Sequence, residues 1–65
     1  MRIFKVQGMN CGHCVRAITQ ALQRRDPQAQ VQVDLAAGEV RIAGELADTA
    51  VVEAIREAGY AASTA

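Results

Sequence analysis

The sequence predicts an α+β fold, a four-stranded antiparallel sheet with two helices packed on one of its faces. Short segments with apolar residues at every second position are typical of strands, and two longer segments carry apolar residues at helical spacing. The glycines and the single proline fall between these segments. The chain has 65 residues, enough for one compact domain, which we expect to span residues 1–65.

The first part of the chain predicts one strand and one helix. Residues 2–7 alternate between apolar and polar side chains and form the expected strand. Residues 8–13 contain two glycines and are expected to form a loop. From residue 14 onward apolar residues recur at helical spacing, so residues 14–25 predict an amphipathic helix that ends with two arginines, which suit the negative end of its dipole. The apolar positions are Phe4 and Val6 in the strand and Val15, Ile18, Ala21 and Leu22 in the helix.

The middle of the chain predicts a β-hairpin. Residues 30–35 alternate and form the second strand, residues 36–38 form the turn, and residues 40–42 form a third strand that pairs with the second. Gly44 breaks the third strand. The apolar positions are Val31, Val33 and Leu35 in one strand and Val40 and Ile42 in the other.

The last part of the chain predicts a second helix and a short closing strand. Asp48 or Thr49 can cap the helix, Gly59 ends it, and residues 60–63 form the strand. The resulting order is strand-helix-strand-strand-helix-strand, and two such split halves build the ferredoxin-like sandwich. The apolar positions of this helix are Val51, Val52, Ile55 and Ala58.

The composition argues against several classes of function. Seven basic and seven acidic residues cancel, which gives no electrostatic basis for binding nucleic acid or an anionic membrane. One Phe, one Tyr and no Trp argue against an aromatic platform for stacking bases. No segment approaches the ~20 apolar residues of a membrane span, and charges interrupt the N-terminal segment, unlike in a signal peptide. We therefore expect a soluble, cytoplasmic protein without membrane insertion.

The two cysteines, Cys11 and Cys14, are the residues most suited to chemistry. Their C-x-x-C spacing closes too small a loop to stabilise the fold as a disulfide, so in a reducing compartment they indicate a metal site or a redox pair. The start of a helix offers unpaired N–H groups and partial positive charge, which favour thiolate over thiol. Thiolates are the ligands that soft ions such as Cu(I) prefer, whereas a structural zinc site usually has four protein ligands.

Three stretches of the chain together form a pattern that is more specific than a bare C-x-x-C. They are Phe4-x-Val6-x-Gly8-Met9-x-Cys11-x-x-Cys14, Val33-Asp34-Leu35 and Ala54-Ile55-x-x-Ala58-Gly59-Tyr60. This pattern resembles the heavy-metal-associated domain family over nearly the whole chain. The family has the ferredoxin-like fold and includes copper chaperones and the N-terminal domains of metal-transporting P-type ATPases. The segment 27–31 departs from it, because it lacks the Gly-Val that the family often has there.

The resemblance implies a role for four residues of the site. Cys11 and Cys14 would be the metal ligands. Met9 would point inward and anchor the loop rather than bind metal. Tyr60 would lie near the sulfurs, pack at the end of the sheet and shield the metal, and a tyrosine at this position resembles the bacterial copper chaperones.

The other residues of the loop have less specific roles. His13 also resembles the bacterial copper chaperones, and it is either a solvent-facing loop residue or a proton acceptor or auxiliary ligand beside the metal. Gly8 and Gly12 are expected to serve the backbone conformation of the loop.

Copper, mercury and zinc are the candidate metals within the resemblance. Zinc-selective members tend to carry Asp at the position of Asn10, where it adds charge and a hard oxygen ligand that Asn does not supply. Mercury binders of this type are commonly exported to the periplasm, and this sequence shows no export signal. Cu(I) is therefore the expected metal, with Ag(I) as its mimic.

The resemblance implies a carrier rather than an enzyme. We expect partly exposed sulfurs to pass Cu(I) by thiolate exchange to a copper-transporting P-type ATPase or another copper acceptor. The chain should be a monomer without metal, and two chains can share copper in a copper-bridged dimer. The alternatives are a regulatory domain of a copper-transporting ATPase, a mercury- or zinc-binding relative, a small dithiol redox protein and a metal-free interaction module.

Four basic side chains are candidates for a docking face toward an acidic partner. They are Lys5, Arg16, Arg24 and Arg25, of which Arg16 is the best placed because it falls in the first turn of the predicted helix. The alternative is that these charges form an ordinary solvated surface.

Overall fold

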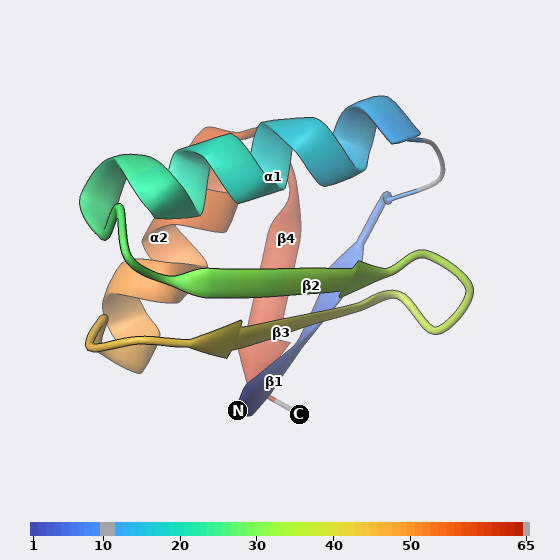
Figure 1. The fold of residues 1–65 in the computed structure, drawn as a ribbon. Coiled ribbons are helices and arrows are strands. Elements are labelled where there is room, and N and C mark those ends of the chain that lie inside the picture. Colours follow the sequence, from blue (N-terminus) through green and yellow to red (C-terminus); the bar gives the residue numbers. More distant parts are fainter. Residues whose placement is uncertain (10–11, 65) are drawn as a thin grey trace.

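The computed structural model describes residues 1–9 and 12–64, and its elements follow the predicted order (Figure 1). This confirms the α+β class and the βαββαβ order of the ferredoxin-like sandwich. No helix in the described part of the chain is long and apolar enough to cross a membrane. The elements are strand β1 (Arg2–Gln7), helix α1 (Gly12–Arg25), strand β2 (Gln30–Asp34), strand β3 (Glu39–Ala43), helix α2 (Asp48–Glu57) and strand β4 (Ala61–Thr64).

The strands form one antiparallel sheet in the order β2-β3-β1-β4. β2 and β3 pair as the predicted hairpin, with Val33 opposite Val40. β1 lies between β3 and β4, and at its C-terminal end Gln7 is opposite Ala61. Because the two strands run in opposite directions, this register brings the residue after β1 next to the residue before β4. Two parts of the predicted site that are far apart in the sequence therefore meet at this edge.

Both helices cover the same face of the sheet, and the core lies between the two layers (Figure 1). Buried and exposed residues alternate along β1 and β3, because successive side chains of a strand point to opposite faces. On the uncovered face polar side chains pair instead, as where the Lys5 ammonium lies 3.0 Å from the Glu39 carboxylate. The buried apolar residues are Phe4, Val6, Met9, Cys14, Ile18, Leu22, Ala29, Val40, Ile42, Val51, Ala54 and Ile55.

Helix α1 begins earlier than its apolar periodicity predicted. We expected a loop as far as His13, but the described helix starts at Gly12. Both residues are exposed, so they add nothing to the apolar pattern on which that prediction depended. The stripe is also rotated by one residue, since Val15 is only half-buried. The side chains of α1 that are buried are Cys14, Ile18 and Leu22.

Strand β2 lies at an edge of the sheet and ends one residue earlier than predicted. Leu35, which we expected in the strand, lies in the following turn and is 37% exposed. The turn is closed by the Asp34 carboxylate, which accepts a hydrogen bond from the Ala37 N–H at 3.1 Å. Because only β3 flanks this strand, Val31 and Val33 stay half-buried.

Helix α2 begins without the side-chain cap that the sequence predicted. Its N-cap is Ala47, and no side chain bonds to the first turn there. Asp48 is the first helical residue instead, and its carboxylate lies 2.6 Å from Arg2 Nη1 on β1. A carboxylate in the first turn still suits the positive end of the helix dipole. At the other end β4 starts at Ala61, one residue later than predicted, so Tyr60 precedes the strand.

The loop after α1 is tied to the loop before α2 by one carboxylate. Asp26 accepts hydrogen bonds from the backbone N–H groups of Gln28 and Glu45, each at 3.2 Å. Gly44 fits closely against this carboxylate, since a Cβ there would lie 2.7 Å from Asp26 Oδ2 and 3.3 Å from Ala29 Cβ. These contacts hold the region at the C-terminal end of α1.

Candidate metal centre

Of the two cysteines in the predicted site, Cys14 is described, whereas Cys11 and Asn10 lie outside the described residues. Cys14 is the third residue of α1. The first turn of a helix has unpaired N–H groups and partial positive charge, and both stabilise the negative charge that a metal-binding thiolate carries. Within residues 1–9 and 12–64, no group of three or more His, Cys, Asp or Glu side chains is arranged so that it could hold a metal ion.

Cys14 is more deeply buried than we expected of a partly exposed sulfur. Its side chain is 4% exposed and belongs to the core cluster together with Met9. The reason is its spacing from Ile18 and Leu22, which are both fully buried and lie four and eight residues further along α1. Cys14 therefore lies on the face of α1 that packs against the core. Its side chain is buried there, so this part of the predicted site belongs to the interior of the protein.

Residues 8–11 connect β1 to α1 and are called the metal loop below; its first two residues are described. Gly8 has φ +89°, a left-handed conformation that residues other than glycine rarely adopt. The conformational role expected of Gly8 is thus confirmed. Met9, which follows, is 8% exposed and belongs to the core cluster. Its side chain points inward, in the direction that an anchor of the loop requires.

Tyr60 lies between α2 and β4, against the start of the metal loop. A Cβ built on Gly8 would lie 3.6 Å from Tyr60 Cδ1, so the ring is in van der Waals range of this position. The side chain is half-buried and packs against the core cluster. This contact was not foreseen from the sequence. The signal that could have found it is the pairing of β1 with β4, which places the residues next to Gln7 and Ala61 side by side.

Gly12 and His13 occupy the first turn of α1 and are exposed. Gly12 is the first residue of α1, and a Cβ there would meet no described atom within 4 Å. The conformational role expected of Gly12 stays a prediction. His13 is on the surface, next in sequence to the buried Cys14.

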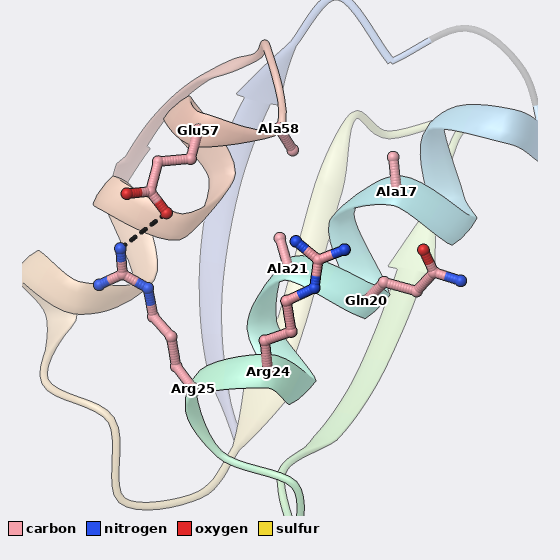
Figure 2. Close-up of a pocket in the computed structure, with 7 residues that line it drawn as sticks. All are labelled: Ala17, Gln20, Ala21, Arg24, Arg25, Glu57 and Ala58. Carbon is pink, nitrogen blue, oxygen red and sulfur yellow. Dashed lines mark hydrogen bonds and ion pairs between the residues drawn. The ribbon is translucent and has the colours of Figure 1, made fainter.

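The basic residues proposed as a docking face separate into two kinds. Arg25 forms ion pairs within the chain. Its guanidinium lies 2.8 Å from Glu57 on α2 (Figure 2) and 3.7 Å from Glu53 on the same helix. The hydrogen bond to Glu57 is the main cause that raises the pKa of Arg25 above its usual value. Lys5 is paired with Glu39 on the uncovered face of the sheet.

Arg16 and Arg24 lie on the exposed surface of α1, which contains no acidic residue. Within the described residues no ion pair involves either of these arginines. Arg24 borders a shallow groove of about 320 Å³ between α1 and α2 (Figure 2). The groove is lined by Ala17, Gln20, Ala21, Arg24, Arg25, Glu57 and Ala58.

The chain matches the heavy-metal-associated domain over residues 3–61 of its 65. It belongs to the heavy-metal-associated domain family, as the sequence pattern indicated.

Relatives of the chain include copper chaperones of similar length. CopZ of Staphylococcus aureus (strain bovine RF122 / ET3-1) is 34% identical over 61 residues, which cover 89% of this chain and 90% of CopZ. CopZ of Bacillus subtilis (strain 168) is 32% identical over 62 residues, 91% of this chain and 90% of CopZ.

Solved structures agree with this relationship. The copper chaperone Atx1 from Synechocystis PCC6803, in its Cu2 form, superposes with a TM-score of 0.93 at 35% identity, over 97% of this chain and 100% of Atx1. The copper-binding domain of HMA7, a P-type ATPase, superposes with a TM-score of 0.85 over 98% of this chain and 90% of that domain. At 20% identity, the second likeness supports the fold alone.

Proposed function

We propose that this chain is a copper chaperone that binds Cu(I) through the thiolates of Cys11 and Cys14 and hands it to an acceptor protein. Copper is the cargo, and no covalent bond of an organic substrate is made or broken, so the proposed activity is not enzymatic. Ag(I), with the same charge and a similar preference for sulfur, should bind as a mimic. The proposed place of action is the cytoplasm.

The observation that carries the proposal is the position of Cys14 in the first turn of α1, in a chain whose relatives are copper chaperones. The partial positive charge of the helix start stabilises a thiolate and the negatively charged complex that two thiolates form with one Cu(I). Cys11 is three residues earlier, a spacing that allows both sulfurs to converge on one ion. In this proposal Met9 anchors the loop through its packing in the core cluster and is not one of the ligands.

Two thiolates suit Cu(I) better than Zn(II). Cu(I) is stable in near-linear coordination by two soft donors. Zinc in proteins usually has four protein ligands, or three protein ligands and a water. Asn10, beside Cys11, supplies no carboxylate that would favour zinc. The expected preference is therefore for monovalent over divalent ions.

Transfer is proposed to occur by exchange of thiolate ligands. A thiolate of the acceptor attacks the two-coordinate copper and forms a three-coordinate bridged intermediate, and then one of the original sulfurs leaves. A second exchange completes the transfer, and copper stays monovalent throughout. Tyr60 and His13, at the edge of the loop, are proposed to shield the sulfurs and to assist their protonation, respectively.

The proposed acceptor is an acidic metal-binding domain, such as that of a copper-transporting P-type ATPase. The surface of α1 offers Arg16 and Arg24 without an internal counter-charge among the described residues, on the helix that carries Cys14. An acidic partner face would be steered to this surface, mainly through the association rate. Reversing both charges (Arg16→Glu, Arg24→Glu) should slow association at low salt, whereas Arg41→Glu on the uncovered face of the sheet should not.

The test is anaerobic transfer of Cu(I) from the loaded chain to a separately purified acceptor domain, followed by the copper content of each protein. The wild-type chain should load with copper and pass it on, and the double variant Cys11→Ser, Cys14→Ser should not load. Ala54→Ser is the matched control, because it also places a hydroxyl at a small, fully buried position but leaves both sulfurs in place. Disulfide exchange by the metal-free chain, without copper uptake, would instead support the redox alternative.

A further inference from the structure

Helix α2 ends in a hydrogen-bonded cap that depends on a glycine. Gly59 has φ +99°, its N–H donates to the Arg56 carbonyl at 2.9 Å, and the N–H of Tyr60 donates to the Ile55 carbonyl at 3.2 Å. This is the pattern of a Schellman motif, in which the residue after the C-cap is left-handed. A Cβ at Gly59 would meet no atom within 4 Å, so the backbone conformation, and not space, is what requires glycine.

The cap fixes the residue that follows it. The carbonyl that holds Tyr60 belongs to Ile55, whose side chain is fully buried, so the backbone of Tyr60 is attached to a rigid part of the helix. From there the tyrosine ring lies beside Gly8, with Tyr60 Cδ1 3.6 Å from the position that a Cβ on Gly8 would take. Gly8 is the residue at which the chain leaves β1, and the next residue, Met9, is already in the core.

We propose that Gly59 is a positioning residue for the metal loop. By holding the cap of α2, Gly59 sets the tyrosine ring against Gly8 and so covers the point at which the chain leaves β1 toward Cys11. The inference depends on the proposed function, because its consequence is for copper held by that loop. Replacing Gly59 by alanine forces the backbone out of the left-handed region or strains it, the ring moves, and the loop releases copper faster.

The first test needs no metal. Tyr60 is the single tyrosine of a chain without tryptophan, so its fluorescence reports on this ring alone. In the metal-free protein, acrylamide should quench Tyr60 more strongly in Gly59→Ala than in the wild type. Gly59→Asn should fall close to the wild type, because asparagine adopts the left-handed conformation at lower cost. Equal quenching in all three proteins would overturn the proposal.

The second test measures the rate at which bathocuproine disulfonate removes Cu(I) from the loaded chain. Gly59→Ala and Tyr60→Ala should each raise this rate severalfold. The double variant should release copper no faster than Tyr60→Ala, because Gly59 acts through the ring. Gly44→Ala is the control for general destabilisation, since Gly44 packs against Asp26 at the far end of α1, and its rate should equal that of the wild type.

The outcomes separate the two proposals. If the wild type takes up copper but the effects of Gly59→Ala and Tyr60→Ala simply add, the positioning role is wrong and the carrier function stands. If Gly44→Ala releases copper as fast as Gly59→Ala, loss of stability explains both effects and the positioning role is again wrong. If the wild type takes up no copper, the proposed function fails, and this inference fails with it.

Discussion

At the end of α1, the carboxylate of Asp26 joins two loops through hydrogen bonds to Gln28 and Glu45. At the start of α1, by contrast, Cys14 and Met9 are buried in the core, and the glycines of the loop and of the α2 cap set the backbone. About 20 Å separates the two ends of this 14-residue helix, at about 1.5 Å per residue. Hydrogen bonds to one carboxylate therefore stabilise the C-terminal end of α1. At its N-terminal end, apolar packing and the backbone conformation of glycines determine the structure.

This difference implies that stability and metal binding can be changed separately. A substitution at the far end should alter the free energy of unfolding and leave the affinity for copper as it is in the folded protein. A substitution near Met9 or Tyr60 should act mainly on the metal loop. Four substitutions test whether the two ends of α1 are independent in this way.

The largest loss of stability is expected from Leu22→Ala. Leu22 is fully buried in the second half of α1, and truncating such a residue costs about 2–5 kcal/mol through lost burial and the cavity left behind. The matched control is Leu35→Ala in the exposed turn after β2, which should cost less than about 0.5 kcal/mol. Urea unfolding of both variants measures the difference. Equal effects would contradict the assignment of the core.

The next largest effect is expected from Gly44→Ala. The added methyl group would lie 2.7 Å from Asp26 Oδ2, so the carboxylate or the backbone must move. Overpacking of this kind costs about 1–3 kcal/mol. Copper affinity, measured by chelator competition under conditions where both proteins are folded, should match the wild type. A weaker affinity would show that the two ends are coupled through α1.

Met9→Leu should have a smaller effect on stability, below about 1.5 kcal/mol, because leucine conserves the volume and the apolar character of the buried side chain. It removes the thioether sulfur, so it also tests the role proposed for Met9. Chelator competition should give the same Cu(I) affinity as in the wild type. A clear loss of affinity would place Met9 among the ligands.

The smallest effect is expected from Arg25→Gln, which removes the surface ion pairs between α1 and α2. Such pairs are screened by salt and contribute little to stability. Because the pKa of Arg25 is raised in the folded protein, its contribution is complete below the unfolded pKa of arginine and is lost only at higher, strongly alkaline pH. The effect should therefore be constant around neutral pH and should shrink in high salt. A change in this effect between pH 6 and pH 8 would contradict this view of the pair.

Most of the fold could be predicted because its signals are local. Phe4 and Val6 on β1, and Val40 and Ile42 on β3, alternate as strands with one covered face do, and all four are buried. The errors fall where local patterns carry no information. Gly12 and His13, which begin α1, are exposed and add nothing to the apolar periodicity, and α2 follows Ala47, which has no side chain that could cap a helix.

The site was predicted less completely than the fold. The inward direction of Met9 followed from the family resemblance, and the structure agrees. The burial of Cys14 was missed because the residue was considered as a ligand and not as part of the stripe that it forms with Ile18 and Leu22. The contact of Tyr60 with Gly8 depends on the register of two strands far apart in the sequence, which periodicity alone does not provide.

The most direct test of the central claim is an anaerobic titration of the reduced chain with Cu(I) against a competing chelator, repeated with Zn(II). The account predicts uptake of about one Cu(I) per chain, a clear preference for Cu(I) over Zn(II), and loss of binding when Cys11 and Cys14 are both replaced by serine. A preference for Zn(II), or unchanged copper uptake by the double serine variant, would contradict it.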